Sequence, residues 1–321
     1  MSTEPTSRMI ETNGIRMRVF EAGSGPAVLL IHGWPESWYS WRHQITHLAE
    51  AGYHVIAPDM RGYGDTDAPE EASQYRIDII VDDVVGILDT LDIDKATIVG
   101  HDWGAMVVWH AALLKPERFN GVLAMSVPYA GPSKEAPLDT WKAAFGENFF
   151  YILYHNETGG VAEVEYDANA RAFIEMLYTS PDTPRADPII TDPLRLAGGW
   201  VGRMGAPLER PEWLAAEDIN YYVSEFERAG FRGGVNYYRN FDRNWHFMQG
   251  RDPVIGIPCA FLAGAADAVI GGADQNGLRA MMSAVMPDLR EITLVPEVGH
   301  WVQQEAPAET SDAVLRFLKS L

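Results

Sequence analysis

Short apolar runs alternate with segments of helical periodicity along the first part of the chain. The runs are continuous, which predicts strands buried on both faces of a parallel sheet. The segments between them space apolar residues three and four positions apart, and this predicts amphipathic helices on both faces of that sheet. The predicted strands are Ala27–Ile31, His54–Asp59, Ala96–Val99 and Gly121–Val127, and the predicted helices are Trp38–Glu50, Arg76–Leu91 and Ala105–Lys115.

The pattern differs at the start of the chain and in its middle. Met9–Thr12 and Ile15–Phe20 flank Asn13-Gly14, a pair favoured in tight turns, so a hairpin is predicted there. Residues 130–247 are rich in aromatic and charged residues, with helical patches and no strand pattern. The alternation then resumes, with predicted strands at Ile257–Gly264 and Glu291–Val295 and predicted helices at Asn276–Val285 and Ala306–Leu321.

These patterns predict an α/β fold in which one core domain is interrupted. Residues 1–129 and 248–321 form the predicted core, with a mostly parallel central sheet flanked by helices. Residues 130–247 form a predicted helical cap, or lid, inserted into it. In an open α/β sheet the ligand lies at the carboxyl ends of the strands, so the loops that follow the strands are the expected site.

Composition narrows the classes of partner. The formal net charge of −20 and the pI of about 4.7 disfavour nucleic acid and membrane surfaces as partners, because phosphate groups repel an acidic surface. The single cysteine, Cys259, lies in an apolar run and is expected to be a small core residue without a disulfide. The start Met1–Arg8 lacks the apolar region of a signal peptide, so a cytoplasmic location is expected.

The strongest chemical signal is Gly100-His101-Asp102-Trp103-Gly104. It follows a predicted strand and precedes a predicted helix, the context in which Gly-x-nucleophile-x-Gly forms a sharp turn that exposes its middle residue. Here that residue is Asp102, which as an isolated match would be interpreted as a helix N-cap. A carboxylate that attacks an sp³ carbon forms an alkyl ester that water can cleave, so the predicted substrates are epoxides or alkyl halides.

Two partners for this nucleophile follow the last two predicted strands. Asp267 follows Ile257–Gly264, and His300 follows Glu291–Val295. The chain order nucleophile, acid, histidine is typical of one class of hydrolase, in which the histidine acts as general base and the acid orients it. Asp252 and Asp274 are alternatives for the acid, although neither directly follows a strand.

A turn after the first parallel strand supplies the third part of the predicted site. It reads His32-Gly-Trp-Pro35, and its glycine allows the backbone to approach the nucleophile closely. The backbone N–H groups of Trp34 and Trp103 are the predicted oxyanion hole. Pro35 has no N–H to donate and is expected to fix the turn. The segment from Asp59 to Gly64 is expected to brace this loop.

These segments resemble the epoxide hydrolases of the α/β-hydrolase fold, of the soluble mammalian and plant type, over the hydrolase domain only. The resemblance is carried by residues 32–42 (HGWPESWYSWR), Arg61-Gly-Tyr-Gly64, residues 100–104, residues 230–240 (GFRGGVNYYRN) and Gly299-His-Trp301. It implies hydrolysis of epoxides to vicinal diols through an ester on Asp102. Haloalkane dehalogenases share several of these motifs and are the alternative, and a non-catalytic binding protein of the same fold is an alternative of another class.

The resemblance also implies two tyrosines of the cap as proton donors. Tyr151 and Tyr238 match the family's first and second cap tyrosines, and their phenols would bind the epoxide oxygen and protonate the alkoxide. Tyr154, three residues after Tyr151, is an alternative for the first donor. The side chains expected to line the substrate pocket are Trp34, Pro35, Trp103, Tyr154, His155 and Trp301.

Neither a cofactor nor a metal ion is expected. The chain has no phosphate-binding glycine loop, and the pair His43 and His47 lacks a third ligand and is expected to face solvent. The expected partners are therefore a small apolar epoxide and water, with a homodimer possible.

Overall fold

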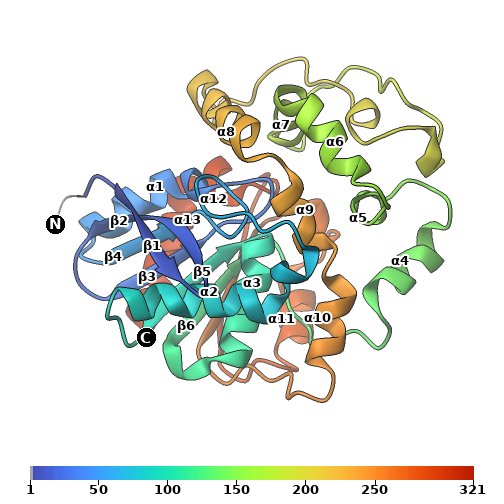
Figure 1. The fold of residues 1–321 in the computed structure, drawn as a ribbon. Helices are drawn as coiled ribbons and strands as arrows, with labels where there is room; N and C mark the ends of the chain where they lie inside the picture. The colour runs from blue at the N-terminus through green and yellow to red at the C-terminus, as the bar shows by residue number, and fades with distance from the viewer. Residues whose placement is uncertain (1–2) are drawn as a thin grey trace.

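The computed structural model describes residues 3–321, so the first two residues of the polar start lie outside it. Within these residues eight strands form one sheet in the order β1-β2-β4-β3-β5-β6-β7-β8. Helices flank the sheet, as Figure 1 shows. The predicted α/β-hydrolase fold with a mostly parallel sheet is therefore confirmed. The strands are β1 (Thr6–Thr12), β2 (Ile15–Gly23), β3 (Ala27–Ile31), β4 (His54–Pro58), β5 (Ala96–His101), β6 (Phe119–Met125), β7 (Cys259–Gly264) and β8 (Leu289–Val295).

The first two strands form the predicted hairpin and leave the rest of the sheet parallel. Asn13 and Gly14 both have positive φ, 44° and 77°, as a type I′ turn requires. β1 pairs antiparallel with β2, and β2 pairs antiparallel with β4. The remaining strands pair in parallel, so their carboxyl ends lie at one edge of the sheet.

Two apolar layers sandwich this sheet. Alternate side chains of β3 point to opposite faces, with Leu29 and Ile31 in one cluster and Val28 and Leu30 in the other. The apolar faces of α2 and α3 belong to the first cluster, and those of α1 and α13 to the second. The α-helices are α1 (Arg42–Glu50), α2 (Ile77–Thr90), α3 (Trp103–Leu114), α4 (Pro137–Phe145), α5 (Tyr151–His155), α6 (Val161–Ala168), α7 (Ala170–Leu177), α8 (Ala216–Ala229), α9 (Arg232–Tyr238), α10 (Phe241–Met248), α11 (Gln275–Met282), α12 (Val302–Glu305) and α13 (Pro307–Ser320). The 3₁₀ helices are η1 (Trp38–Trp41), η2 (Ala72–Tyr75), η3 (Pro116–Arg118), η4 (Arg195–Ala197), η5 (Val201–Arg203) and η6 (Ala268–Ile270).

A helical segment separates β6 from β7. It holds α4 to α10, and Figure 1 shows α5, α6, α7 and α8 lying outside the sheet and its flanking helices. Polar contacts attach α8 to the core: the Tyr39 hydroxyl donates to Asp218 Oδ1 at 2.9 Å, and Arg18 pairs with Glu225 at 2.6 Å. The Tyr237 hydroxyl on α9 donates to the Arg61 carbonyl at 3.1 Å. The inserted segment is thus held against the core at α8 and α9.

The observed element bounds differ from the predicted ones by a few residues. The strand predicted at Gly121–Val127 ends at Met125. Ser126 has a positive φ of 67°, which turns the chain away from the sheet. Cys259 is buried in β7, and His43 and His47 are exposed on α1, as expected. Among the described residues, no helix combines the length and the apolar character that crossing a membrane requires.

Candidate active site

Asp102 stands at the sharp turn between β5 and α3. Its φ of 52° and ψ of −116° are rare for a residue with a side chain. A Cβ on Gly100 would lie 2.2 Å from the Gly104 carbonyl oxygen, and a Cβ on Gly104 would lie 2.0 Å from the Ile31 carbonyl oxygen. Both glycines are therefore needed for the close packing of strand, turn and helix. The turn holds the Asp102 side chain at the carboxyl edge of the sheet.

Two groups approach the Asp102 carboxylate from the loops after other strands. The Trp34 N–H donates to Oδ1 at 2.8 Å, and His300 Nε2 lies 3.6 Å from Oδ2. A Cβ on Gly33 would lie 2.5 Å from the Asp102 Cβ, so this glycine permits the approach of the Trp34 backbone. Trp103 is the first residue of α3, and its N–H has no intrahelical partner. The residues predicted as nucleophile, base and oxyanion hole thus lie together.

Asp267 holds the other side of the His300 ring. Its Oδ2 lies 2.9 Å from His300 Nδ1, and its Oδ1 accepts a hydrogen bond from the Val269 N–H at 2.9 Å. Burial disfavours the imidazolium, but the carboxylates of Asp267 and Asp102 outweigh it and raise the pKa of His300 well above its ordinary value.

The two alternative acids lie elsewhere. Asp274 accepts a hydrogen bond from the Gly277 N–H at the start of α11, and Asp252 accepts one from the Val254 N–H. Both carboxylates therefore stabilise local turns, and the structure places Asp267 next to His300 instead.

A buried network of hydrogen bonds, which the sequence did not reveal, holds the backbone of His300 in place. His101 Nδ1 contacts Glu36 Oε1, and Gln303 Nε2 donates to Glu36 Oε2 at 3.0 Å. His101 Nε2 lies 2.8 Å from the carbonyl oxygen of His300, and the Ser126 hydroxyl donates to the same oxygen at 3.0 Å. Glu36 and His101 both lie within the motifs quoted above, but spacing alone does not show that they pair.

The loop that carries Trp34 is braced as the sequence predicted. The Met60 N–H donates to His32 Nε2 at 3.0 Å, which requires that nitrogen to be unprotonated. Burial lowers the pKa of His32, against the opposing effect of Asp59. Asp59 accepts from the Trp38 N–H at 3.1 Å. The segment from Asp59 to Gly64 thereby fixes the loop from both ends.

A cavity of about 510 Å³ lies against Asp102 and His300. Its wall includes the predicted tyrosines Tyr151 and Tyr238. The other lining residues are Trp34, Pro35, Leu177, Thr179, Ser180, Pro181, Arg185, Trp200, Ala266, Asp267, Ala268, Val269, Gly299 and Trp301. The core and the inserted helical segment therefore both contribute to this cavity.

The rings of Tyr151 and Tyr238 lie 5.9 Å apart, centroid to centroid. Burial and the nearby Asp102 carboxylate raise the pKa of both phenols. Among the described residues, none is a hydrogen-bond partner of the Tyr151 hydroxyl. Both phenols therefore stay protonated near neutral pH, and that of Tyr151 is available to a ligand.

Three side chains predicted to line the pocket do not lie on its wall. The Tyr154 hydroxyl points away and donates to the Val161 carbonyl at 3.3 Å. His155 Nε2 binds the Tyr166 hydroxyl at 3.0 Å, and the His155 ring packs behind Tyr238 at 4.4 Å. The Trp103 indole packs on Tyr238 at 5.1 Å. Each of the three predictions is wrong because the side chain points away from the cavity. The positions themselves are close to it, since each residue is next to a lining residue or shares a helix with one.

Trp34 and Trp301 do line the cavity, and both are fixed in place. Trp301 stacks on Tyr178 at 4.3 Å, and its indole N–H donates to the Leu177 carbonyl at 2.9 Å. The Trp34 indole stacks parallel to Trp200 at 6.0 Å. The Tyr178 hydroxyl donates to the Pro35 carbonyl at 2.8 Å. Ring contacts and hydrogen bonds therefore position this aromatic wall.

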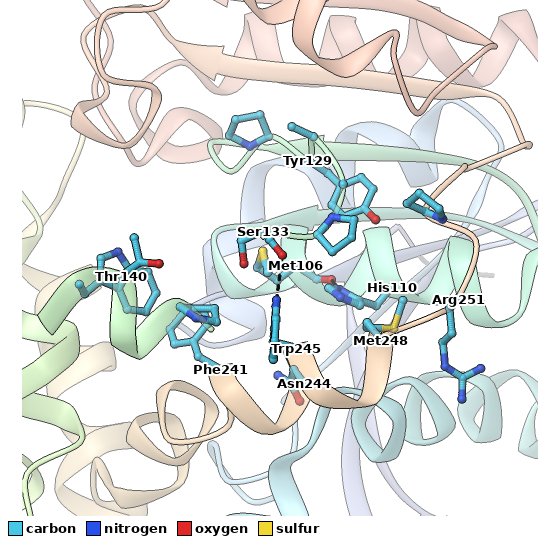
Figure 2. Close-up of a pocket in the computed structure, with 17 residues that line it drawn as sticks. Met106, His110, Tyr129, Ser133, Thr140, Phe241, Asn244, Trp245, Met248 and Arg251 are labelled. Carbon is cyan, nitrogen blue, oxygen red and sulfur yellow. Dashed lines mark hydrogen bonds between the residues drawn. The ribbon is translucent and has the colours of Figure 1, made fainter. Parts of the chain in front are cut away.

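A second cavity, of about 330 Å³, shares no lining residue with the first. Figure 2 shows the side chains that line it. It lies between α3, α4, α10 and the loop after β6, and its wall is mostly apolar. Trp245 closes part of it by donating to the Ser133 carbonyl at 2.9 Å. Phe241 lines this second cavity, and its ring lies 6.0 Å from the ring of Tyr238, which lines the first.

Comparisons with known proteins agree with this geometry. Residues 26–156 match a family model described as the alpha/beta hydrolase fold. Epoxide hydrolase A of Mycobacterium tuberculosis is 43% identical, over 99% of this chain and 98% of that protein. Epoxide hydrolase 2 of Siraitia grosvenorii is 38% identical over 97% of each. The crystal structure of epoxide hydrolase A from Mycobacterium thermoresistibile superposes with a TM-score of 0.90 at 42% identity, over 98% of each chain.

Proposed function

The chain belongs to the epoxide hydrolases of the α/β-hydrolase fold, and from this membership we propose a two-step mechanism centred on Asp102. An epoxide and water are the reactants, and a vicinal diol is the product. One arrangement carries the proposal: Asp102 lies between the Trp34 N–H and His300, in a cavity that two tyrosines also line.

In the first step Asp102 opens the epoxide. Because the Trp34 N–H already holds Oδ1, the attacking atom is Oδ2. Oδ2 bonds to one ring carbon, the bond from that carbon to the epoxide oxygen breaks, and an alkyl ester forms. The phenols of Tyr151 and Tyr238 bind the epoxide oxygen, and one of them gives its proton to the developing alkoxide.

The second step follows from the loss of charge at Asp102. Its carboxylate helps to raise the pKa of His300 in the free protein, and the ester no longer does so. The pKa of His300 therefore falls when the ester forms, and its proton passes to the tyrosinate left by the first step. The neutral imidazole then takes a proton from water. That water attacks the ester carbonyl carbon, and the N–H groups of Trp34 and Trp103 stabilise the negative Oδ1. Cleavage releases the diol and the carboxylate, and His300 is left protonated, as in the free protein.

The inserted segment has a catalytic part in this scheme. We assign residues 130–247 as the cap, because Tyr151 and Tyr238 come from it and the triad comes from the remainder of the chain. Catalysis then requires the cap and the core to be held together, which the contacts of α8 and α9 with the core provide.

A paired turnover assay tests the function. The purified protein receives styrene oxide, with diol measured, and separately bromobutane, with bromide measured. The proposal expects diol and no bromide. Bromide without diol would instead support a dehalogenase, in which the Trp103 indole is expected to bind halide, whereas here that indole packs on Tyr238. Asp102→Ala is the control and should form neither product.

A cytoplasmic location and a homodimer stay predictions. Exposed apolar side chains within the cap, such as Ile189 and Leu196, each 90% exposed, support association of two chains. Analytical ultracentrifugation of the purified protein, which measures the mass in solution, tests whether two chains associate.

A further inference from the structure

Glu305 is a partly buried carboxylate at the end of α12, shortly after the proposed base His300. Its Oε2 accepts a hydrogen bond from the Gly299 N–H at 3.0 Å, and its Oε1 accepts one from the Trp301 N–H at 2.9 Å. Because both oxygens accept, the side chain is an ionised carboxylate. One side chain therefore holds the backbone N–H groups of both residues that flank His300.

The space around Glu305 fits this double contact. A Cβ on Gly299 would lie 2.9 Å from Glu305 Oε1 and 2.8 Å from Pro181 Cδ, so a larger residue would displace the carboxylate from the backbone. The Glu305 N–H in turn donates to the Trp301 carbonyl at 2.7 Å, which fixes the helical turn that carries the carboxylate. The loop around His300 is thus shaped to hold Glu305 in one position.

The charge of Glu305 acts on the proposed base. Among the described residues, no lysine or arginine forms an ion pair with Glu305. Burial raises the pKa of Glu305, and the two N–H donors and the positive charge of His300 oppose this effect. Because an electrostatic interaction acts on both partners, the Glu305 carboxylate favours the protonated form of His300.

Other ionisable groups contact His300 through its ring. Asp267 lies at Nδ1 and Asp102 at Nε2. The ring of His101 packs at 4.8 Å, centroid to centroid. Glu305 differs from all three, because it is hydrogen-bonded to the backbone on either side of His300 and leaves both ring nitrogens to their partners.

We propose that Glu305 is a positioning residue for ester hydrolysis, which orients His300 toward the water and stabilises the imidazolium that forms. This inference rests on the proposed function and adds to it a residue that acts in the second step. A positive charge develops on His300 when the ring takes a proton from water, and a carboxylate that is already in place stabilises it without rearrangement. The first step does not use His300 as a base, so the rate of alkylation should depend little on Glu305.

Two substitutions separate the charge of Glu305 from its reach. In Glu305→Gln the side chain keeps its size, but the amide is neutral and its one oxygen accepts from one of the two N–H groups. Glu305→Asp keeps the charge on a side chain that is shorter by one carbon. Glu165→Gln is the matched control, because Glu165 on α6 also accepts from two backbone N–H groups, those of Trp200 at 2.8 Å and Val201 at 3.1 Å.

Rapid mixing with styrene oxide separates the two steps. Intact mass spectrometry of quenched samples follows formation and decay of the ester, and the decay is repeated across pH. In Glu305→Gln, ester hydrolysis should slow about tenfold while alkylation stays close to the wild-type rate. The midpoint of the pH profile of hydrolysis should also fall, because the neutral amide no longer favours the imidazolium. Glu305→Asp should slow hydrolysis and keep the wild-type midpoint, and Glu165→Gln should change neither the hydrolysis rate nor the midpoint.

Two results overturn the inference and leave the proposed function intact. Hydrolysis by Glu305→Gln at the wild-type rate, with an unchanged midpoint, removes the role of Glu305. An equal slowing of alkylation and hydrolysis with an unchanged midpoint assigns the effect to a general loss of structure. If Glu305→Gln does not fold, Glu305→Asp decides, and equal slowing of both steps or a shifted midpoint overturns the inference. If the wild type forms neither ester nor diol, the proposed function itself fails, and this inference fails with it.

Discussion

His101 Nε2 lies 2.8 Å from the carbonyl oxygen of His300, so the residue before the proposed nucleophile is hydrogen-bonded to the backbone of the proposed base. A carbonyl accepts, so Nε2 carries a proton. The contact of Nδ1 with Glu36 Oε1 holds another proton between the two side chains. Glu36 and His101 are fully buried, which makes this contact strong and its loss costly.

We therefore predict that Glu36→Gln slows the reaction about tenfold or more and lowers the melting temperature by several degrees. The amide can contact His101 only by donating to an unprotonated Nδ1, so the charge of the carboxylate is lost and the His300 backbone is held less firmly. Steady-state kinetics and calorimetry measure the two effects. The pH profile of ester hydrolysis distinguishes two effects of the substitution. A change in the position of His300 shifts the midpoint of the profile, whereas a general loss of stability does not. Wild-type kinetics with an unchanged profile would contradict this role for Glu36.

The meeting of the proposed active-site residues could be predicted from the sequence because each of them lies in a loop that follows a strand. Parallel strands end at one edge, so Trp34, Asp102, Asp267 and His300 had to lie near one another. The position of each residue relative to a strand end therefore predicts most of this arrangement. The glycines around Asp102 predict the sharp turn that exposes its side chain.

Side-chain direction and long-range pairing could not be predicted in the same way. Tyr154 is one helical turn from Tyr151 yet points toward Val161, because α5 presents only one face to the cavity. Glu36 and His101 pair across 65 positions of sequence, and their partnership depends on how the turns after β3 and β5 pack. Arg185 lies in a loop without periodicity, so no pattern marked its place on the cavity wall.

His300→Gln should trap the ester on Asp102. The first step needs only the nucleophile and the tyrosines, whereas the second needs a base, so turnover is expected to fall about 10²- to 10⁴-fold while alkylation continues. Intact mass spectrometry should then show an increase equal to the mass of the substrate. Asp102→Asn treated in the same way is the control and should show no increase. Normal turnover by His300→Gln would place the base elsewhere.

Removal of the cavity phenols should slow the first step. Tyr151→Phe and Tyr238→Phe are each expected to lose about tenfold in the rate of alkylation, and the double variant about 10²- to 10⁴-fold, because one phenol partly replaces the other. Tyr154→Phe is the matched control, since its hydroxyl lies away from the cavity. Rapid mixing with single-turnover analysis measures the rate. A larger loss in Tyr154→Phe than in Tyr151→Phe would reverse the assignment.

Asp102→Asn should lower the pKa of His300, because the amide is neutral like the ester of the proposed intermediate. Burial opposes the imidazolium in the wild type, and Asp267 together with Asp102 outweighs it and raises the pKa of His300. Removing the charge of Asp102 leaves Asp267 as the remaining carboxylate partner, so the pKa falls. Titration of the His300 ring protons by NMR, in both proteins, measures the shift directly.

The same shift has a consequence for stability. A raised pKa in the folded state means that protonated His300 stabilises the fold, fully below the pKa of the unfolded chain, about 6.5, and progressively less as the pH rises through the folded value. The free energy of unfolding of the wild type should therefore decrease with rising pH over that window, and that of Asp102→Asn should decrease less. Urea unfolding at several pH values tests this. Equal pH dependence in the two proteins would show that Asp102 does not control the proton on His300, and the change of His300 into a base on ester formation would then need another cause.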